Sequence, residues 1–238
     1  MYFGLMANSR NNLTNLTFVV TGANRGIGLE FARQLNELNA QVIATARSLE
    51  KAEKLIDHNI RTEVLDITNP TSIKKFVRRL VGIPVDILIN NAGVGVAEKN
   101  FKTLKMSEIE WQFQVNCIGT LNIIQALLPH LQKGKRKLVI SISSKSGSIH
   151  HNVEGTGYGY RASKAALNMV NKNLSIEFES QGFTFVVLHP GSVRTDMTHH
   201  SGPLSPRESV EGMLQVIMGL GPQHNGKFVD YQGETIPW

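Results

Sequence analysis

A regular alternation of short apolar runs and helical stretches is the feature that most restricts the fold of this chain. Residues 16–20 form an apolar run typical of a buried strand, and apolar residues at helical spacing follow from Leu29 onward. The same pattern recurs along the 238 residues without an internal repeat or a low-complexity linker. It predicts an α/β fold, a doubly wound parallel β-sheet with helices on both faces.

One domain accounts for most of the chain. Residues 1–15 are polar, rich in Asn and unperiodic, so we expect a flexible N-terminal tail. Residues 16–238 then form a single domain with a short loop at 196–206, rich in Gly, Pro, Ser and His. No apolar run approaches the roughly 20 residues of a membrane span. The single cysteine, Cys117, excludes an intrachain disulfide and favours a reducing, cytoplasmic location.

A glycine-rich turn joins the first predicted strand to the first predicted helix. Gly22, Gly26 and Gly28 are spaced Gly-x-x-x-Gly-x-Gly between an apolar run and a helical pattern. Glycines let the backbone approach a pyrophosphate closely, and the free N–H groups at a helix start attract its negative charge. The turn therefore predicts a phosphate site for a dinucleotide.

Two arginines favour a phosphorylated coenzyme. Arg47 follows the second predicted strand, residues 41–45, where NAD-binding proteins carry an acid against the ribose 2′-hydroxyl. An Arg at that place accommodates a 2′-phosphate, and Arg25 adds a second cation inside the glycine turn. Either arginine alone could be a surface charge. Together they predict NADP(H).

Two serines, a tyrosine and a lysine suggest proton-transfer chemistry. Ser143 and Ser144 follow an apolar run at 138–142, and Tyr160 and Lys164 lie one turn apart in a predicted helix. A nearby ammonium favours the phenolate and lowers the pKa of a tyrosine, which can then exchange a proton with a carbonyl or alcohol oxygen. A Tyr-x-x-x-Lys pair also occurs by chance on many helices. The other motifs of the chain favour the functional interpretation.

Small and polar residues also follow the strand predicted at 86–90. Asn91, Ala92 and Gly93 lie at its carboxyl end, where ligands bind in open α/β sheets. Asn116 lies in the middle of a stretch, 104–131, that is predicted to be largely helical. A polar amide among apolar neighbours has either a buried partner or a catalytic water, and the sequence leaves both alternatives open.

These features together resemble the short-chain dehydrogenase/reductase family, from about residue 16 to the end of the chain. The motifs that carry the resemblance are Thr21-Gly22-x-x-x-Gly26-x-Gly28, Asp66, Asn90-Asn91-Ala92-Gly93, Asn116, Ser144, Tyr160-x-x-x-Lys164 and Pro190-Gly191 with Thr195. The resemblance implies a single-domain Rossmann fold, an NADP(H) coenzyme and a small-molecule carbonyl or alcohol substrate.

By this resemblance the catalytic residues are Asn116, Ser144, Tyr160 and Lys164. Tyr160 is the acid and base, while Lys164 lowers the pKa of Tyr160 and holds the nicotinamide ribose. Ser144 positions the substrate oxygen, and it is preferred to Ser143 because the family's serine is usually the second of such a pair. Asn116 anchors a water in the proton relay.

The resemblance also implies the coenzyme site. Asp66 and Ile67 flank the adenine, and Thr195 holds the nicotinamide amide. The predicted coenzyme-binding residues are Gly22, Asn24, Arg25, Gly26, Ile27, Gly28, Arg47, Asp66, Ile67, Asn91, Ala92, Gly93, Tyr160, Lys164, Pro190, Gly191, Val193 and Thr195.

The loop between Ser144 and Tyr160 is longer than in the commonest members of the family. Together with the residues around Tyr160 and the ending at 231–238, it resembles Sniffer-type carbonyl reductases and C-factor-like proteins. C-factor members are linked with cell–cell signalling. A nucleotide-binding signalling protein in which turnover is incidental is therefore the alternative function.

Other function classes fit the sequence less well. The formal charge of +6 is dispersed, and its densest cluster, 133–137, has no groove-reading motif, so no nucleic-acid partner is expected. The pairs His150-His151 and His199-His200 could suggest a metal, but hydride chemistry requires none, so no metal is predicted. Little chain follows the helix predicted at 207–220, which leaves no room for the sugar-binding domain of an epimerase or dehydratase on nucleotide sugars.

We therefore predict an NADP(H)-dependent oxidoreductase, most simply an NADPH-dependent carbonyl reductase, that passes hydride between nicotinamide and a carbonyl or secondary alcohol. Val96 and Met197 are candidate walls of its substrate pocket. The loop at 196–206 carries no obvious charged anchor except Asp196, which favours an uncharged, partly apolar substrate. The expected assembly is a homo-oligomer, a dimer or tetramer, with no membrane partner.

Overall fold

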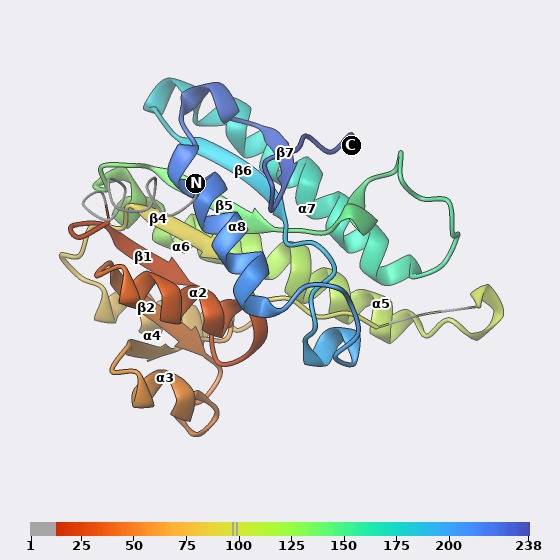
Figure 1. Ribbon diagram of the computed structural model, residues 1–238, viewed down its shortest axis with the longest axis horizontal. Helices are drawn as coiled ribbons and strands as arrows, with labels where there is room; N and C mark the ends of the chain where they lie inside the picture. Colours follow the sequence, from red (N-terminus) through yellow and green to blue (C-terminus); the bar gives the residue numbers. More distant parts are fainter. Residues whose placement is uncertain (1–12, 97, 99) are drawn as a thin grey trace.

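Seven parallel strands form one sheet in the order β3-β2-β1-β4-β5-β6-β7 (Figure 1). The computed structural model describes residues 13–96, 98 and 100–238. The strands are β1 (Thr17–Val20), β2 (Gln41–Ala46), β3 (Arg61–Val64), β4 (Ile87–Asn90), β5 (Leu138–Ile142), β6 (Thr184–His189) and β7 (Lys227–Asp230). The strand order reverses between β1 and β4, which is where doubly wound sheets bind their ligands. The predicted doubly wound α/β fold is confirmed.

Helices cover both faces of this sheet. They are α2 (Gly26–Glu37), α3 (Glu53–Asp57), α4 (Pro70–Arg79), α5 (Met106–Phe113), α6 (Thr120–Gln132), α7 (Tyr158–Glu177) and α8 (Pro206–Gly219). Alternate residues of β1 point into two separate cores, because strand side chains alternate between faces. Phe18 belongs to the core under α2 and α8, and Val19 to the core under α4 and α6. Figure 1 shows α2 and α8 side by side on the near face.

Local signals explain several helix ends. Asn69 caps α4, since its side chain accepts hydrogen bonds from the backbone N–H groups of Thr71 and Ser72, and Pro70 is the first helical residue. Ser205 caps α8 in the same way, and Glu208 closes the reciprocal bond to Ser205.

The long helix predicted at 104–131 is interrupted. A π-helical segment, Gln114–Gly119, separates α5 from α6. A Cβ on Gly119 would lie 2.8 Å from Cγ1 of Ile67, so the backbone of this segment packs directly against the residues that follow β3. Single π-turns inside helices are frequent at functional sites, and this one carries Asn116.

The packed part of the chain begins earlier than the predicted boundary at residue 16. Leu13 is only 3% exposed and belongs to the core under α2 and α8, and its carbonyl accepts a hydrogen bond from the N–H of Leu16. Residues 13–15 are therefore not a loose tail. The remainder of the predicted tail, residues 1–12, lies outside the described residues.

A buried aspartate joins three strands at the amino end of the sheet. Asp86 is 3% exposed and directly precedes β4. Its Oδ2 accepts a hydrogen bond from the N–H of Thr17 at 2.8 Å, and its Oδ1 accepts one from the N–H of Lys135 at 2.6 Å. The carboxylate thus fixes the starts of β1 and β5 relative to β4, at the edge opposite the carboxyl ends of the strands.

We predict that Asp86→Ala destabilises the protein by about 2–4 kcal/mol, because a buried and a partly buried N–H group lose their acceptor. Asp57→Ala is the matched control, since Asp57 is exposed at the end of α3, and its free energy of unfolding should change by at most about 0.5 kcal/mol. Urea denaturation of the three proteins measures both. If the urea denaturation curve of Asp86→Ala overlays that of the wild type, the two hydrogen bonds of Asp86 do not stabilise the sheet as predicted.

Candidate active site

Hydrogen bonds tie the loops after β1 and β4 together. The Oγ1 of Thr21 accepts from the N–H groups of Asn91 and Ala92, at 3.0 Å each. In return the side-chain amide of Asn91 donates to the carbonyls of Thr21 and Gly22, at 3.0 and 3.1 Å. The two predicted coenzyme loops therefore form one unit at the point where the strand order reverses.

Only glycine fits this unit at two positions. Gly22 has φ +63°, and a Cβ on it would lie 2.9 Å from Cα of Ala92. A Cβ on Gly28 would lie 2.4 Å from Nδ2 of Asn91. The helix α2 starts at Gly26 without a side-chain cap and without an acidic residue in its first turn. Its first N–H groups thus face the cavity unpaired by a side chain, an arrangement that suits a pyrophosphate.

The residues predicted for the adenosine end lie after β2 and β3. Arg47 is exposed and makes no hydrogen bond or ion pair with any described residue. The Oδ1 of Asp66 accepts from both the N–H and the hydroxyl of Thr68, at 2.9 and 2.7 Å. Ile67 is buried against the backbone of Gly119. Of the side chains that could flank an adenine, Asp66 is thus held by Thr68 of its own loop and Ile67 by the segment around Gly119.

Arg25 is engaged, in contrast to Arg47. Its Nη1 donates to Oδ2 of Asp196 at 2.8 Å, which links the glycine turn to the loop after β6. Both side chains are exposed, at 67% and 53%. The two arginines predicted to favour a 2′-phosphate thus differ, since one is unpaired among the described residues and the other already has a carboxylate partner.

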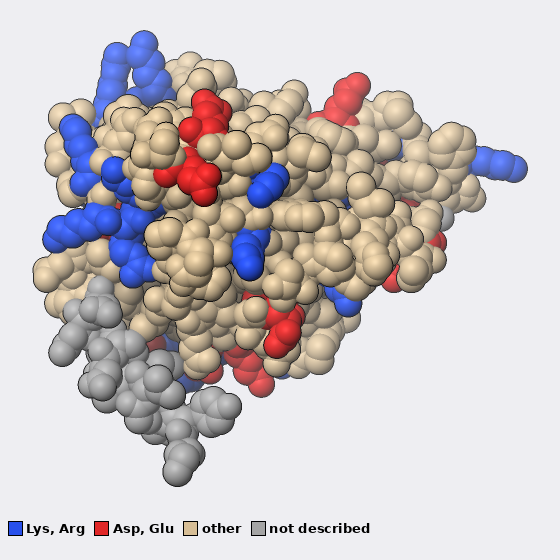
Figure 2. All heavy atoms as spheres, turned by 90° about the horizontal axis from the view of Figure 1, so that it is seen from above, with Lys and Arg blue, Asp and Glu red and all other residues tan. Residues whose placement is uncertain are grey.

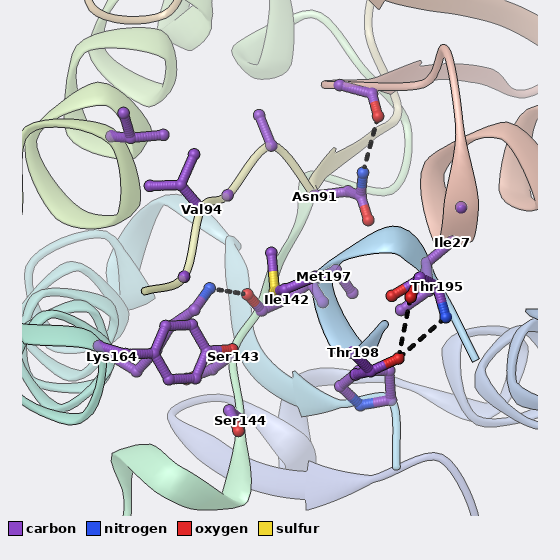
Figure 3. Close-up of a pocket in the computed structure, with 18 of the residues that line it drawn as sticks. Ile27, Asn91, Val94, Ile142, Ser143, Ser144, Lys164, Thr195, Met197 and Thr198 are labelled. Carbon is purple, nitrogen blue, oxygen red and sulfur yellow. Dashed lines mark hydrogen bonds between the residues drawn. The ribbon is translucent and has the colours of Figure 1, made fainter. Parts of the chain in front are cut away.

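The helix α7 places Tyr160 and Lys164 on the same face, as predicted. The Nζ of Lys164 donates to the carbonyl of Ile142 at the end of β5, at 2.9 Å, and lies 5.8 Å from the ring centroid of Tyr160. Figure 3 shows this lysine reaching from α7 toward the strand end. Lys164 is 5% exposed, so its charge lies in a largely dry environment.

Burial sets the proton affinities of this pair. It lowers the pKa of Lys164 to about 8 from 10.5. Burial also raises the pKa of Tyr160, and a hydrogen bond with Ser144 lowers it by less. The expected lowering of the Tyr160 pKa by Lys164 is thus not found among the protein's own groups. The ammonium is directed at a carbonyl oxygen instead of the phenol, and the dry surroundings disfavour the phenolate.

The two serines after β5 have different roles. The hydroxyl of Ser143 is buried and donates to Oδ1 of Asn168 at 2.8 Å. The Oγ of Ser144 accepts from the N–H of Ser146 at 3.1 Å, and the same hydroxyl interacts with Tyr160 at the cavity. This difference favours Ser144 over Ser143 as the serine that contacts a ligand.

Asn116 has a buried protein partner, one of the two predicted alternatives. Its side chain is fully buried and makes hydrogen bonds with the N–H and carbonyl of Val94, at 2.8 and 2.9 Å, and with the hydroxyl of Ser163, at 2.9 Å. A Cβ on Gly93 would lie 3.3 Å from its Oδ1, so Asn116 stands behind the loop after β4. Its role with a water remains a prediction.

The loop after β6 closes the other side of the site. Gly191 has φ +80°, and a Cβ on it would lie 2.6 Å from Cδ1 of Leu204. Val193 is buried and forms a bridge with Leu204. Thr195 approaches the glycine turn, since a Cβ on Gly26 would lie 3.4 Å from its Cγ2. Figure 3 shows Thr195 on the same side of the site as Ile27 of the glycine turn.

One cavity of about 980 Å³ collects these residues at the carboxyl ends of the strands. All the predicted catalytic and coenzyme-binding residues line it except Asn116. Val96 and Met197, the predicted pocket walls, line it as well. The sequence motifs thus meet in a single site large enough for a dinucleotide and a small substrate.

Sequence reasoning missed some lining residues. The Nη2 of Arg161 donates to Oε2 of Glu154 at 2.6 Å at the cavity wall, and Trp111 lines the cavity from α5. His189 also lines it, and burial lowers the pKa of this histidine to about 4, so its ring is neutral at pH 7. None of these residues belongs to a motif. The only signal in the sequence was position, since Arg161 follows Tyr160 and His189 precedes Pro190.

Other candidate sites gain no support. Among the described residues, no three His, Cys, Asp or Glu side chains group closely enough to hold a metal ion. Lys133 and Lys135 are exposed in the turn before β5, at the amino end of the sheet and away from the cavity. Figure 2 shows Lys and Arg side chains gathered toward that end of the molecule. No helix in the described ranges is long and apolar enough to cross a membrane.

Comparisons with known proteins agree with this geometry. A family profile described as short chain dehydrogenase matches residues 16–204. The C-signal protein of Myxococcus xanthus is 41% identical over 166 residues, which cover 70% of this chain and 100% of that protein. The solved structure of the carbonyl reductase Sniffer of Drosophila melanogaster is 33% identical with a TM-score of 0.89, over 94% of this chain and 100% of that one.

A second solved structure is that of an NADPH-bound carbonyl reductase from chicken fatty liver. It is 33% identical with a TM-score of 0.87, and the match covers 95% of this chain and 100% of the other. The similarity therefore extends over the whole sheet and its loops, including the segment after residue 204 that the family profile does not cover.

We predict that the buried charge of Lys164 makes stability depend on pH. The folded-state pKa is about 8 and the unfolded value about 10.5, so the unfolded chain binds more protons between these values. The free energy of unfolding therefore rises with pH in this window, whereas below it both states are protonated and the slope vanishes. Relative to Lys164→Met, the wild type should gain about 1 kcal/mol between pH 7 and 9.

Urea denaturation at pH 6, 7, 8 and 9 measures this difference. Comparison with Lys164→Met cancels the titration of all other groups, so the remaining slope belongs to Lys164. Parallel stability curves for the two proteins across the whole range would show that Lys164 keeps its ordinary pKa in the folded state.

Proposed function

The chain belongs to the short-chain dehydrogenase family, and from this premise we propose that it is an NADPH-dependent carbonyl reductase. It is an oxidoreductase of one α/β domain. Its cavity lies at the carboxyl ends of the strands, where doubly wound sheets bind their ligands. The observation that carries the proposal is that Tyr160, Lys164 and Ser144 line the same cavity as the glycine turn.

The first step is binding of the coenzyme, for which the glycine turn supplies the phosphate contacts. The start of α2 and the glycines at 22 and 28 fit a pyrophosphate, because the helix start has no side-chain cap and the glycines carry no side chain of their own. Arg47 at the end of β2 offers a guanidinium to a 2′-phosphate. Solved relatives with NADPH or NADP bound support this choice over NAD. When bound, the nicotinamide supplies the hydride.

The second step is proton transfer to the substrate oxygen. In the proposal Ser144 donates a hydrogen bond to that oxygen, because its hydroxyl lines the cavity beside Tyr160. Tyr160 gives its phenolic proton to the same oxygen as hydride reaches the carbonyl carbon. Lys164 uses one N–H on Ile142, which leaves its other donors for a ribose hydroxyl. The raised pKa of Tyr160 suits an acid that must carry its proton at neutral pH.

The substrate class follows from the walls of the cavity. Val94, Val96, Trp111 and Met197 give its substrate end an apolar lining. The Arg161 guanidinium at the wall is already paired with Glu154. An uncharged, partly apolar aldehyde, ketone or quinone fits such a lining best.

A signalling protein with incidental turnover remains the second candidate, because C-signal is a relative of 41% identity. Coenzyme binding alone would not require a phenol and a serine hydroxyl at the nicotinamide end. The reductase is therefore preferred. NADPH that binds tightly, yet is not oxidised by any aldehyde, ketone or quinone of a broad panel, would favour the signalling alternative.

We predict that Tyr160→Phe lowers kcat by roughly 10²–10⁴, the usual share of general acid catalysis, with little change in NADPH affinity. Tyr158→Phe is the matched control, because Tyr158 is 39% exposed on the same helix and its ring contacts Phe101. Steady-state oxidation of NADPH gives kcat, and fluorescence titration gives the affinity. Full turnover by Tyr160→Phe would refute the assignment of the acid.

A further inference from the structure

Asp196 is a carboxylate shared by a guanidinium and an imidazole at the edge of the cavity. Its Oδ2 accepts from Nη1 of Arg25 at 2.8 Å, and its Oδ1 lies 3.2 Å from Nε2 of His200. Arg25 comes from the glycine turn, whereas Asp196 and His200 come from the loop after β6. Both Arg25 and Asp196 line the cavity. The ion pair therefore spans the opening between the two sides of the coenzyme site.

The segment that carries Asp196 is internally fixed. The hydroxyl of Thr198 donates to the carbonyls of Val193 and Thr195, at 2.7 and 3.0 Å, and accepts from the N–H of Thr195 at 3.0 Å. The N–H of His200 returns to the carbonyl of Thr195 at 2.8 Å. These bonds make residues 195–200 a compact turn, so a change at Asp196 is passed to the whole segment.

We propose that Asp196 competes with the coenzyme's 2′-phosphate for Arg25 and thereby sets the preference between NADPH and NADH. This rests on the proposed coenzyme role of the site. Arg25 is exposed enough to turn toward a phosphate, and an exposed ion pair is worth little, so exchange of partners is easy. A phosphate accepts two parallel charge-assisted bonds from a guanidinium, as a carboxylate does, and carries more charge.

The competition is selective because Asp196 acts through Arg25, whose other partner in this proposal is the 2′-phosphate that NADH lacks. NADH carries a hydroxyl where NADPH carries a phosphate. A neutral hydroxyl binds a guanidinium less strongly than a carboxylate does, so NADH leaves the Arg25–Asp196 pair intact. Arg47 has no partner among the described residues and is available to either coenzyme without exchange. The negative charge of Asp196 therefore weakens the binding of NADPH and leaves the affinity for NADH unchanged.

The exchange also reaches the substrate end of the cavity. Met197 follows Asp196 directly, and its Sδ would lie 3.5 Å from a Cβ on Gly95. The ring of Tyr160 lies at the same place, with Cδ2 at 3.3 Å from that position. Figure 3 shows Met197 at the centre of the site, between Thr195 and Lys164. When NADPH takes Arg25 from Asp196, the neighbouring Met197 beside Tyr160 therefore becomes less firmly held. NADH does not have this effect.

The test uses a double-mutant cycle with Asp196→Asn, Arg25→Ala and the double variant, each titrated with NADPH and NADH by fluorescence. Asp196→Asn should tighten NADPH by about threefold to fivefold, up to about 1 kcal/mol, with NADH unchanged within about 1.5-fold. In the Arg25→Ala background the same substitution should change NADPH affinity by less than about twofold. Glu211→Gln is the charge-matched control, because Glu211 pairs with Arg207 outside the cavity.

Hydrogen exchange of residues 195–201 supplies a second readout that needs no turnover. In the wild type, saturating NADPH should leave these amides exchanging faster than saturating NADH does, and in Asp196→Asn the difference should vanish. The proposal is overturned if Asp196→Asn weakens both coenzymes, which would make the ion pair a clasp over the coenzyme. It is equally overturned if the substitution changes neither affinity, or changes both by the same factor. Loss of carbonyl reduction alone would bear on the proposed function and not on this competition.

Discussion

The contact between the loops after β1 and β4 is the constraint on which the site depends. The Thr21 hydroxyl accepts two backbone hydrogen bonds from the loop after β4, and the Asn91 side-chain amide donates two to carbonyls of the loop after β1, at the point where the strand order reverses. This contact requires glycine at positions 22 and 28, since a Cβ at either would strike the opposite loop. The same glycines leave the start of α2 open toward the cavity. Loop packing and anion binding thus have a single structural cause.

A second network fixes the proton-transfer end. Asn116 joins the loop after β4 to Ser163 of α7, the helix that carries Tyr160 and Lys164. Lys164 in turn reaches the end of β5. Burial disfavours both charged forms here, since it lowers the pKa of the ammonium and raises that of the phenol. The site therefore holds its proton on Tyr160 until a ligand changes the local electrostatics, as the proposed acid requires.

Local patterns made most of the fold and site predictable. Strand and helix periodicity gave the sheet and its helices, and the turn chemistry of Asn69-Pro70 gave the start of α4. Many of the motif residues line one cavity because they follow strand ends, which meet at one edge of a parallel sheet, whereas Tyr160 and Lys164 reach it from α7. Contacts distant in sequence could not be predicted in this way. The pairing of Arg25 with Asp196 spans 171 residues, and the interrupted segment Gln114–Gly119 packs closely against Ile67, which is also distant in sequence. The Tyr160 pKa was misjudged because sequence spacing gives neither the direction of the Lys164 ammonium nor the burial.

In the proposed complex, a phosphorylated dinucleotide lies across the reversal of strand order with its nicotinamide beside Tyr160. A crystal structure of the chain with NADP⁺ tests it most directly. We expect the pyrophosphate at the N–H groups of the glycine turn, the 2′-phosphate near Arg47, and the nicotinamide between Thr195 and Lys164. A dinucleotide bound in the reverse direction, or bound away from the start of α2, would contradict the account.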